Sequence, residues 1–432
     1  MKNFLIIFFS VCAIFAQNIG SWENYTSMKN TFDLDVYHNK IWCASDGGIF
    51  EFNSSDSSFV EIKKNDGLNS QFVSAVAFDS VNQNLWIGTT EGFLNVYNLK
   101  NHTIEKLYDI NRSNFTKKTI KSIQVYGDTV IVGLEFGMSL LNAKTFQFIE
   151  TTTKFGNFSS GIEAFDINYD KIFYVCTNEG LAVQKAGSKN LSNPDSWLTF
   201  SKTSLGVDRI TSCFNYSSLL TISSSKGFYQ YNNGSWTKFL SVNDSIANVY
   251  VLGDELYYTT RNKLYHYSPS LSNPYIELFS DDFLKIRQFK IHGNDFMIAS
   301  NQGLVFNGKK IIPNGPPSNS FQNMDIDNDG NLWVGTGKDV FGVGFSKFDG
   351  NEWTNYNTST LPMLLSNAFH NVYAAPDNSI YFMNWGKGFT RLKNKKFSNF
   401  YINNTDLVGI PAATSFLVID DIVADKNNNV WI

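Results

Sequence analysis

The sequence predicts an all-β fold, a β-propeller made of four-stranded blades. Two observations support this: a five-residue apolar segment recurs about every 40 residues, and a turn containing glycine follows most of its copies. Four short antiparallel strands in a repeat of this length are typical of a propeller blade. The apolar segments are "IWCAS" (41–45), "LWIGT" (85–89), "VIVGL" (130–134), "FYVCT" (173–177), "LLTIS" (219–223), "LYYTT" (256–260), "FMIAS" (296–300), "LWVGT" (332–336) and "IYFMN" (380–384), with "VWI" (430–432) at the end.

Each repeat supplies three further strands around its apolar segment, which is expected to be the second strand. A polar turn joins it to a first strand, as in "IDNDGNLW", and a glycine turn leads to a third, as in "SKGFYQY". The fourth strand carries an aromatic pair such as Trp353 and Tyr356. The recurring turn glycines are expected to have positive φ angles; they are Gly47, Gly92, Gly180, Gly227, Gly303 and Gly388.

The chain divides into a leader and two propellers. Residues 1–16 are predicted to be a signal peptide, because Lys2 precedes an apolar run and Ala16 offers a small-residue cleavage point. We therefore expect an exported protein of the periplasm or outer-membrane surface. No later segment reaches the roughly 20 apolar residues of a membrane helix, so no membrane span is expected in this fragment.

The first propeller is predicted to occupy residues 17–319 and to have seven blades. It ends in the Pro/Gly/Ser-rich stretch "NGKKIIPNGPPSNS", which is typical of a linker. Residues 320–432 contain two full units and the beginning of a third, an incomplete second propeller. Because repeat arrays need a closed or capped end, we expect the sequence to be a fragment of a longer protein.

The stretch "SWENYTS" (21–27) resembles a fourth strand without a blade. Trp22 and Tyr25 have the spacing of Trp353 and Tyr356. We expect this stretch to pair along the outer edge of the seventh blade and so close the ring. The competing interpretation is that "KKII" (309–312) fills that position itself.

Composition and motifs assign no catalytic, cofactor-binding or metal-binding residue. The net charge of −4 and pI of about 5.8 give no basic footprint, so no nucleic-acid partner is expected. Of the four cysteines, Cys12 lies in the leader, and three remain after its removal: Cys43, Cys176 and Cys213. Because their number is odd and none has CxxC spacing, we expect buried thiols rather than a disulfide framework or a zinc site. The five histidines are scattered and match no hydrolase or metalloprotease motif.

Two segments bear on ligand binding. "DIDNDG" (325–330) resembles the start of a calcium loop, but Thr336 stands where the bidentate Glu should be, so a structural turn is expected. "NRSNFTKKTIK" (111–121) carries Arg112, Lys117, Lys118 and Lys121. It is either a solvated loop or a patch for an anionic glycan or lipid headgroup. The ligand-binding residues themselves stay unassigned, and no enzyme is expected.

Residues 327–356, "DNDGNLWVGTGKDVFGVGFSKFDGNEWTNY", resemble the two-component-regulator propeller repeat. "GKDVFGVG" is an insertion relative to that pattern, and the other units match it more loosely. The residues that fill the pattern are Asp327, Gly330, Leu332, Trp333, Gly335, Thr336, Phe348, Asp349, Gly350, Trp353 and Tyr356.

Two families carry such repeats behind a signal peptide. The chain resembles the PorZ-like proteins of the type IX secretion attachment complex in its divergent first propeller, its early "SWENYTS" and its Ala-Gln junction. That resemblance implies a non-catalytic scaffold that engages other attachment-complex proteins and anionic lipopolysaccharide. The alternative is the periplasmic glycan-sensing region of a hybrid two-component histidine kinase. A secretion-signal domain, or a membrane helix followed by a kinase, in the C-terminal continuation would separate the two.

Overall fold

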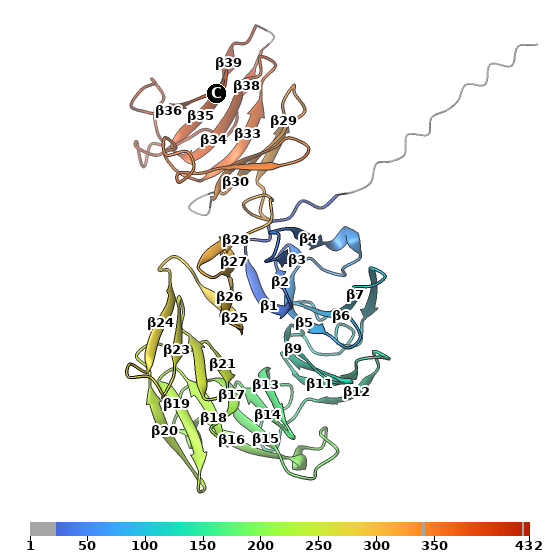
Figure 1. Ribbon diagram of the computed structural model, residues 1–432. Helices are drawn as coiled ribbons and strands as arrows, with labels where there is room; N and C mark the ends of the chain where they lie inside the picture. The colour runs from blue at the N-terminus through green and yellow to red at the C-terminus, as the bar shows by residue number, and fades with distance from the viewer. Residues whose placement is uncertain (1–22, 339–341, 426) are drawn as a thin grey trace, which may run out of the picture.

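The computed structural model describes residues 23–338, 342–425 and 427–432, and β-strands dominate it (Figure 1). The predicted leader and Trp22 lie outside the described residues. The helical elements of the described part are short: η1 (Lys64–Asp66), η2 (Pro194–Ser196) and α1 (Lys202–Leu205). None of its helices has the length and apolar character that a membrane span requires.

Seven four-stranded antiparallel sheets follow one another between Thr31 and Ile311 in the described chain, each with its strands in sequence order. The first three sheets contain β1 (Thr31–Tyr37), β2 (Lys40–Ser45), β3 (Gly48–Asn53) and β4 (Phe59–Ile62); β5 (Val73–Asp79), β6 (Asn84–Thr89), β7 (Leu94–Asn98) and β8 (Thr103–Leu107); and β9 (Ile120–Tyr126), β10 (Thr129–Leu134), β11 (Gly137–Asn142) and β12 (Phe148–Thr152).

The next four sheets repeat this arrangement. They contain β13 (Ala164–Asp170), β14 (Ile172–Thr177), β15 (Gly180–Gln184) and β16 (Trp197–Ser201); β17 (Ile210–Tyr216), β18 (Leu219–Ser224), β19 (Gly227–Asn232) and β20 (Ser235–Ser241); β21 (Asn248–Leu252), β22 (Glu255–Thr259), β23 (Lys263–Tyr267) and β24 (Tyr275–Ser280); and β25 (Ile286–His292), β26 (Asp295–Ser300), β27 (Gly303–Phe306) and β28 (Lys309–Ile311).

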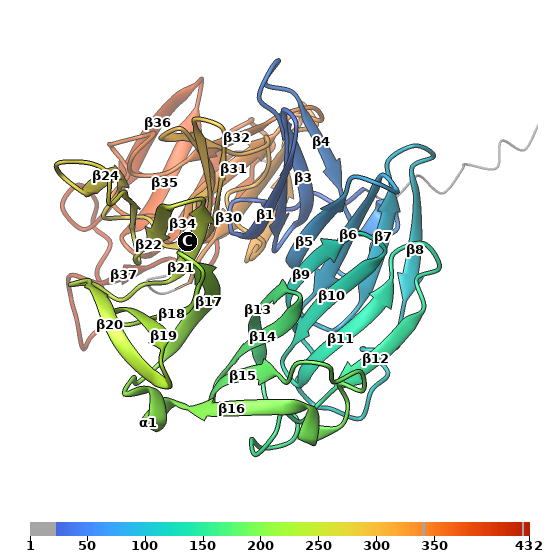
Figure 2. The same ribbon diagram turned by 60° about the horizontal axis from the view of Figure 1, so that its bottom comes forward.

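The seven sheets are arranged as a closed ring. The first strands of successive sheets contact one another in order, and β1 also contacts β25 and β26 of the seventh sheet. Figure 2 shows first strands such as β1, β5, β9, β13 and β17 around the centre, with fourth strands such as β8, β12 and β20 on the outside. The sheets are therefore the blades of a propeller, as the repeat predicts.

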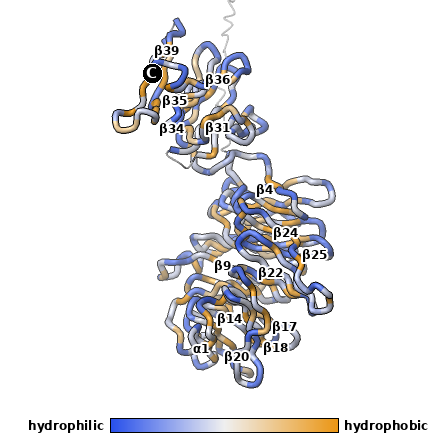
Figure 3. Tube along the Cα trace, turned by 90° about the vertical axis from the view of Figure 1, so that its left-hand side faces the viewer, coloured by the Kyte–Doolittle hydropathy of each residue, from blue (hydrophilic) through white to orange (hydrophobic). Residues whose placement is uncertain are grey.

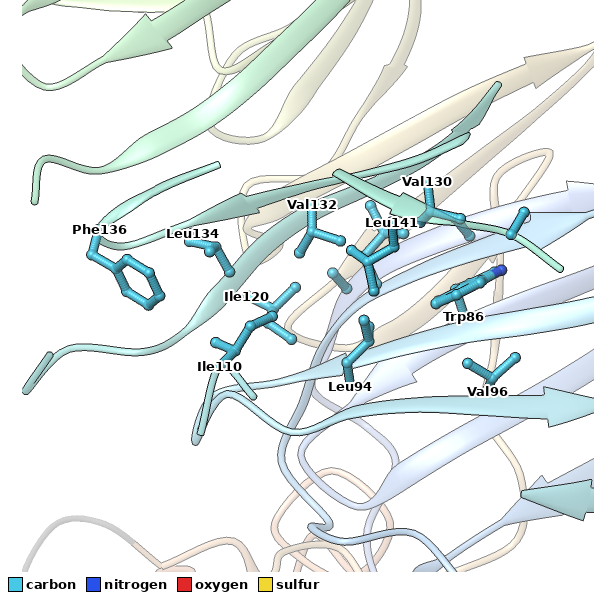
Figure 4. Packing of buried hydrophobic residues seen from close by; sticks show 14 residues of the cluster. Trp86, Leu94, Val96, Ile110, Ile120, Val130, Val132, Leu134, Phe136 and Leu141 are labelled. Carbon is cyan, nitrogen blue, oxygen red and sulfur yellow. The ribbon is translucent and has the colours of Figure 1, made fainter. Parts of the chain in front are cut away.

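The recurring apolar segments form the second strands, which confirms their predicted place. All six residues of β6 are buried. Trp86 in this strand belongs to a core cluster that joins the second sheet to Val130, Val132 and Leu141 of the third (Figure 4). Hydrophobic stretches accordingly lie along the strands and hydrophilic ones in many of the connections (Figure 3). Burial against neighbours on both faces explains why these strands are continuously apolar.

A glycine opens most third strands because the fourth strand passes very close to it. At Gly180, φ is 152° and an added Cβ would lie 2.1 Å from the Phe200 carbonyl oxygen. Gly137 has the same relation to Thr152, with a Cβ-to-oxygen distance of 2.0 Å. In the first sheet this place belongs to Gly48, whereas the expected Gly47 lacks a positive φ. Close backbone approach, as well as turn geometry, therefore requires these glycines.

The structure corrects the expected ring closure. β28, the "KKI" segment, pairs with β27 and is itself the fourth strand of the seventh sheet. The described residues 23–29 form no strand. The reason is local: Asn307 and Gly308, with φ angles of 47° and 83°, form the Asn-Gly turn that favours a tight hairpin. A neighbouring hairpin strand thus takes the edge that a segment almost 300 residues away was expected to fill.

Packing and polar contacts between β1 and the seventh sheet close the ring instead. The Thr31 hydroxyl accepts the Ser300 N–H at 2.7 Å and lies 2.9 Å from the Ser300 carbonyl oxygen. Lys290 Nζ lies 3.4 Å from Asp35 Oδ1. Carboxylates also join neighbouring first strands: Asp33 accepts the Val76 N–H at 3.0 Å and Asp166 accepts the Cys213 N–H at 3.0 Å.

Beyond residue 320 a four-stranded sheet, a five-stranded sheet and a short two-stranded sheet follow in the described residues. They contain β29 (Asn323–Ile326), β30 (Leu332–Thr336), β31 (Gly344–Phe348) and β32 (Trp353–Tyr356); β33 (Phe369–Ala374), β34 (Ile380–Gly386), β35 (Gly388–Lys393) and β36 (Lys396–Phe400), with β37 (Leu417–Val418) added to β34; and β38 (Val423–Ala424) with β39 (Val430–Trp431). The domain boundaries after residues 16 and 319 stay predictions.

The described start of the chain, residues 23–28, is here called the N-terminal strap. Thr26 Oγ1 donates to the Gly47 carbonyl at 2.7 Å in the first sheet, and the Ser27 N–H donates to Asn319 Oδ1 at 2.7 Å. The Tyr25 ring lies 4.5 Å from the Phe348 ring and 6.0 Å from the Trp353 ring, between centroids. The strap therefore contacts the ring, the connecting segment and the first sheet that follows it.

We predict that Tyr25→Ala loosens the attachment of residues 320–432 to the ring. The substitution removes a ring contact with two aromatic side chains, about 1–2 kcal/mol of packing. Limited proteolysis should cut residues 312–320 several times faster than in the unaltered chain, while the melting temperature of the ring changes little.

Tyr126→Ala is the matched control, because Tyr126 is also exposed but its aromatic partner, Tyr169, lies within the ring. Equal cleavage rates in the two variants would show that the strap does not hold the two parts together.

Candidate functional site: a cavity at the centre of the ring

β-Bulges at the start of the first strands turn extra side chains towards the ring centre. In six of the seven ring sheets the register between first and second strand shifts by one residue near this end. Bulges of this kind re-aim a side chain and commonly lie next to functional sites. The bulged residues are Phe32, Ser74, Lys121, Phe165, Thr211 and Arg287.

All six bulged residues line a cavity of about 900 Å³. Its wall also includes the β14–β15 turn at Asn178, the β22–β23 turn at Arg261 and the connections that precede β17, β21 and β25. In an antiparallel blade the start of the first strand and the end of the second lie at the same edge. The cavity therefore occupies the ring centre at the end where the first strands begin.

The cavity wall is rich in basic side chains although the whole chain has a net charge of −4. It carries seven basic and four acidic residues: Lys121, Lys202, Arg209, Arg261, Lys285, Arg287 and Lys290 against Asp33, Glu163, Asp166 and Asp208. Two of the basic groups are paired, Lys121 with Glu163 at 2.8 Å and Lys290 with Asp35. The other five have no ion-pair partner among the described residues.

Arg287 is the most constrained of the unpaired cations. Its guanidinium lies 4.4 Å from the Phe32 ring centroid and donates to Asn30 Oδ1 at 2.8 Å. Its Nε is buried and has no hydrogen-bond acceptor among the described residues. Burial lowers the pKa of Arg287 from its usual value, with Asp46 opposing that shift. Asn30 and Phe32 thus hold this guanidinium in the cavity wall, and Asp46 is the acidic group whose charge acts on it.

Two acidic side chains of the wall ionise with difficulty. Burial raises the pKa of Asp33 to about 6, although the Val76 N–H and Lys290 counter the rise. Burial likewise raises the pKa of Asp166 to about 6. Both carboxylates accept N–H groups of the neighbouring first strand, and this structural hydrogen bonding accounts for their place.

Aromatic side chains stand at the same end of the ring as the cations. Phe32 and Phe165 line the cavity. Phe72 and Phe283, just before β5 and β25, are 43% and 85% exposed. The Phe283 carbonyl accepts from the Gln302 side chain at 2.9 Å, which fixes the backbone of this loop. Exposed rings beside cations suit a ligand that has both an apolar face and negative charge.

The basic stretch 111–121 contributes one residue to the cavity. The Arg112 guanidinium lies 4.9 Å from the Tyr108 ring centroid, and Lys118 donates to the Asn111 carbonyl. Only Lys121 of the four basic residues lines the cavity. The cations that line the cavity instead come from residues far apart in sequence. Some of them are bulged residues, and a bulge cannot be recognised from the sequence of one strand because it depends on how two strands pair.

The "DIDNDG" segment is a structural turn. Asp327 accepts the N–H groups of Asp329 and Asn331 and the Trp333 indole N–H, at 2.8–3.0 Å. Burial opposes ionisation of Asp327, but these hydrogen bonds together outweigh it and lower the pKa of the carboxyl. Asp425 makes equivalent bonds to Asn427 and Asn429 in the last described repeat. Both carboxylates therefore stabilise the turn before the second strand of their repeat. This agrees with the structural turn expected from Thr336, which stands where a calcium loop has a bidentate Glu.

The histidines stay apart, whereas two cysteines come together. His38, His102, His266, His292 and His370 lie in five different sheets or their turns. Cys176 of β14 and Cys213 of β17 face each other beside Asp166, and their ligand atoms lie within 4.8 Å of one another. Sequence spacing missed this pair, because the two residues belong to consecutive blades and only blade packing brings them together.

Comparison with known proteins agrees with the expected resemblance. Residues 41–198 match the family model of the PorZ N-terminal β-propeller domain, and residues 315–338 match that of the two component regulator propeller. The resemblance to both is therefore confirmed for these segments. No curated protein matches the chain.

Many solved structures match this fold, and two of them are informative. PorZ of Porphyromonas gingivalis, described as an essential surface component of the type-IX secretion system, superposes with a TM-score of 0.75 at 18% identity. The extracellular domain of a putative hybrid two component system from B. thetaiotaomicron superposes with a TM-score of 0.50 at 15% identity. Each comparison covers 95% of this chain and 57% of the other, so this chain spans little more than half their length.

We predict that Asp33→Asn weakens the pH dependence of stability. Because the folded-state pKa of Asp33 is raised from 3.8 to about 6, the stabilisation that this group gives at low pH is lost as pH rises between those values. Between pH 4 and pH 7 the free energy of unfolding should fall in both proteins, and the fall should be smaller in the variant by up to about 3 kcal/mol. Denaturant titrations at both pH values measure this.

Asp56→Asn is the control, because its pKa shift has the opposite sign: hydrogen bonds from Ser58 lower the pKa of the exposed Asp56. If Asp33→Asn left the difference between pH 4 and pH 7 unchanged, Asp33 would be ionised normally in the folded protein.

Proposed function

We propose that this chain is part of an exported, non-catalytic propeller scaffold of the type IX secretion attachment complex. In this proposal the ring is PorZ-like, binds anionic lipopolysaccharide in its central cavity, and engages other proteins of the attachment complex. The match of residues 41–198 to the PorZ propeller supports the family context. The predicted leader supports a place in the periplasm or on the outer-membrane surface.

The observation that carries the ligand proposal is the group of unpaired cations around the cavity. Arg209, Arg261 and Lys285 are exposed at its rim, while Arg287 is half-buried in its wall. Charged groups held in a concave wall with limited solvent focus the electric field and attract ions of opposite sign. Since the rest of the chain is acidic, a polyanion would be directed to this end of the ring.

The chemistry of the wall suits a sugar with carboxylate or phosphate groups. Guanidinium groups bind both kinds of anion through paired N–H donors. Phe72 and Phe283 provide exposed ring faces close to the cationic rim, against which the apolar face of a sugar can pack. A nucleic acid would also be anionic, but the overall negative charge of the chain disfavours that class.

The second candidate is a glycan sensor. It is favoured by the likeness of the fold to the extracellular domain of a putative hybrid two component system. In that case the cavity would bind a diffusible oligosaccharide, and the protein would act through a kinase. Loss of the gene would then change transcription in response to a glycan, whereas the scaffold role requires that secreted cargo fail to attach to the cell surface.

We predict that Arg261→Ala/Lys285→Ala weakens binding of purified anionic lipopolysaccharide. Each charge-assisted hydrogen bond contributes about 1.5–3 kcal/mol, so Kd should rise about tenfold or more in low salt. The affinity of the unaltered chain should fall as salt rises, because exposed charges are screened. Titration calorimetry at two salt concentrations measures both effects.

Lys100→Ala/Lys309→Ala is the matched control, because both residues are exposed at the opposite end of their blades. Equal affinity of the two double variants would place the ligand elsewhere. Equal binding of a neutral lipopolysaccharide would overturn the proposed charge selectivity.

A further inference from the structure

Two thiols face each other across the interface between the fourth and fifth sheets. Cys176 lies in β14 and Cys213 in β17, and their exposed fractions are 0% and 2%. Both belong to one apolar cluster with Leu181, Leu205, Ile210 and Ile222. They therefore lie in the packed core that holds one blade against the next.

The local hydrogen bonds fix both cysteines. Asp166 Oδ2 accepts the Cys213 N–H, and the Cys213 thiol donates to the Tyr174 carbonyl at 3.5 Å. Asp166 also pairs with Cys176 in the register of β13 and β14. The two Sγ atoms lie within 4.8 Å of one another, and a covalent S–S bond requires that they approach to roughly 2.05 Å.

We propose that Cys176 and Cys213 form a disulfide that joins the fourth and fifth blades when the chain folds in an oxidising compartment. The inference rests on the export expected from the leader, since such bonds persist outside the cytosol. Each thiol gives up its proton, and the pair gives two electrons to a disulfide oxidant such as oxidised glutathione. The oxidant is thereby reduced to two thiols as the S–S bond forms.

The surroundings favour a permanent bond over a redox switch. Burial raises the pKa of the Cys176 thiol well above its usual value, and burial with the neighbouring Asp166 raises that of Cys213. Since the thiolate is the reactive form, folded reduced protein reacts slowly with oxidants. A sulfur whose thiolate is disfavoured is also a poor leaving group, so the finished bond resists reduction. We therefore expect the two thiols to be oxidised during folding, before the fourth and fifth blades pack against each other.

The disulfide would stabilise a ring whose first and seventh sheets are joined by packing and polar contacts and share no strand. Contacts between neighbouring sheets hold the blades in order, and a covalent link between two of them restricts the unfolded chain. Cys43 provides an internal comparison. It is equally buried but lies in β2 of the first sheet, whereas the pair lies in the fourth and fifth.

The test is refolding of the chain from residue 17 onward, starting from denatured, reduced protein. One sample refolds with reduced and oxidised glutathione and the other with dithiothreitol. Each is then denatured and treated with iodoacetamide before and after reduction, and peptides are identified by mass spectrometry. After glutathione refolding, only Cys43 should be alkylated before reduction, and a Cys176–Cys213 linked peptide should appear.

Variants separate the bond from a general effect of oxidation. Cys43→Ser should keep the linked peptide, and its oxidised form should melt several degrees above its reduced form. Cys176→Ser/Cys213→Ser should show no such difference between the two buffers. Oxidant added to folded, reduced protein should produce the linked peptide far more slowly than oxidant present during refolding.

Three outcomes would overturn the proposal. The first is three free thiols after glutathione refolding, and the second is a linked peptide that contains Cys43. The third is zinc or copper retained by the refolded protein with both thiols intact on denaturation, because the cluster would then be a metal site. The test runs on purified protein, so its outcome is independent of whether the chain serves type IX secretion.

Discussion

Face-to-face packing of each blade on the next is the interaction on which the rest of the structure depends. Trp86 has no exposed surface, because side chains of the second and third sheets enclose it. The same burial recurs around the ring and makes each sheet depend on both neighbours. The first and last sheets meet through packing, a buried hydroxyl and an ion pair, so closure adds the interface that an open array would lack.

That geometry explains why the polar chemistry gathers at the centre. Blade faces are filled by apolar side chains, so they have no room for a ligand. The first strands converge on the axis, where bulges free single side chains such as Lys121, Thr211 and Arg287 from the alternation of the strand. The result is a cavity lined mainly by cations within a protein of net negative charge.

The sequence predicted the features that depend on local pattern. The apolar second strands could be read directly, since burial on both faces leaves a continuous run such as "LWIGT". The spacing of Trp22 and Tyr25 predicts a fourth strand on the edge of the ring, but the strand of the Asn307-Gly308 hairpin fills that edge. Arg287 and the Cys176–Cys213 pair could not be predicted, because each depends on register or on contacts between blades.

Ring closure and the cavity share residues, so binding of the proposed anionic ligand would be coupled to the stability of the ring. Arg287 is the bulged residue of the closing sheet, and its guanidinium bonds to Asn30 and stacks on Phe32 at the start of the first sheet. These partners come together only when the ring is closed. An anion that binds Arg287 in this arrangement binds the closed ring and not an opened one, so by linkage it stabilises closure. The ligand would thus reinforce the one blade interface at which the two ends of the ring meet.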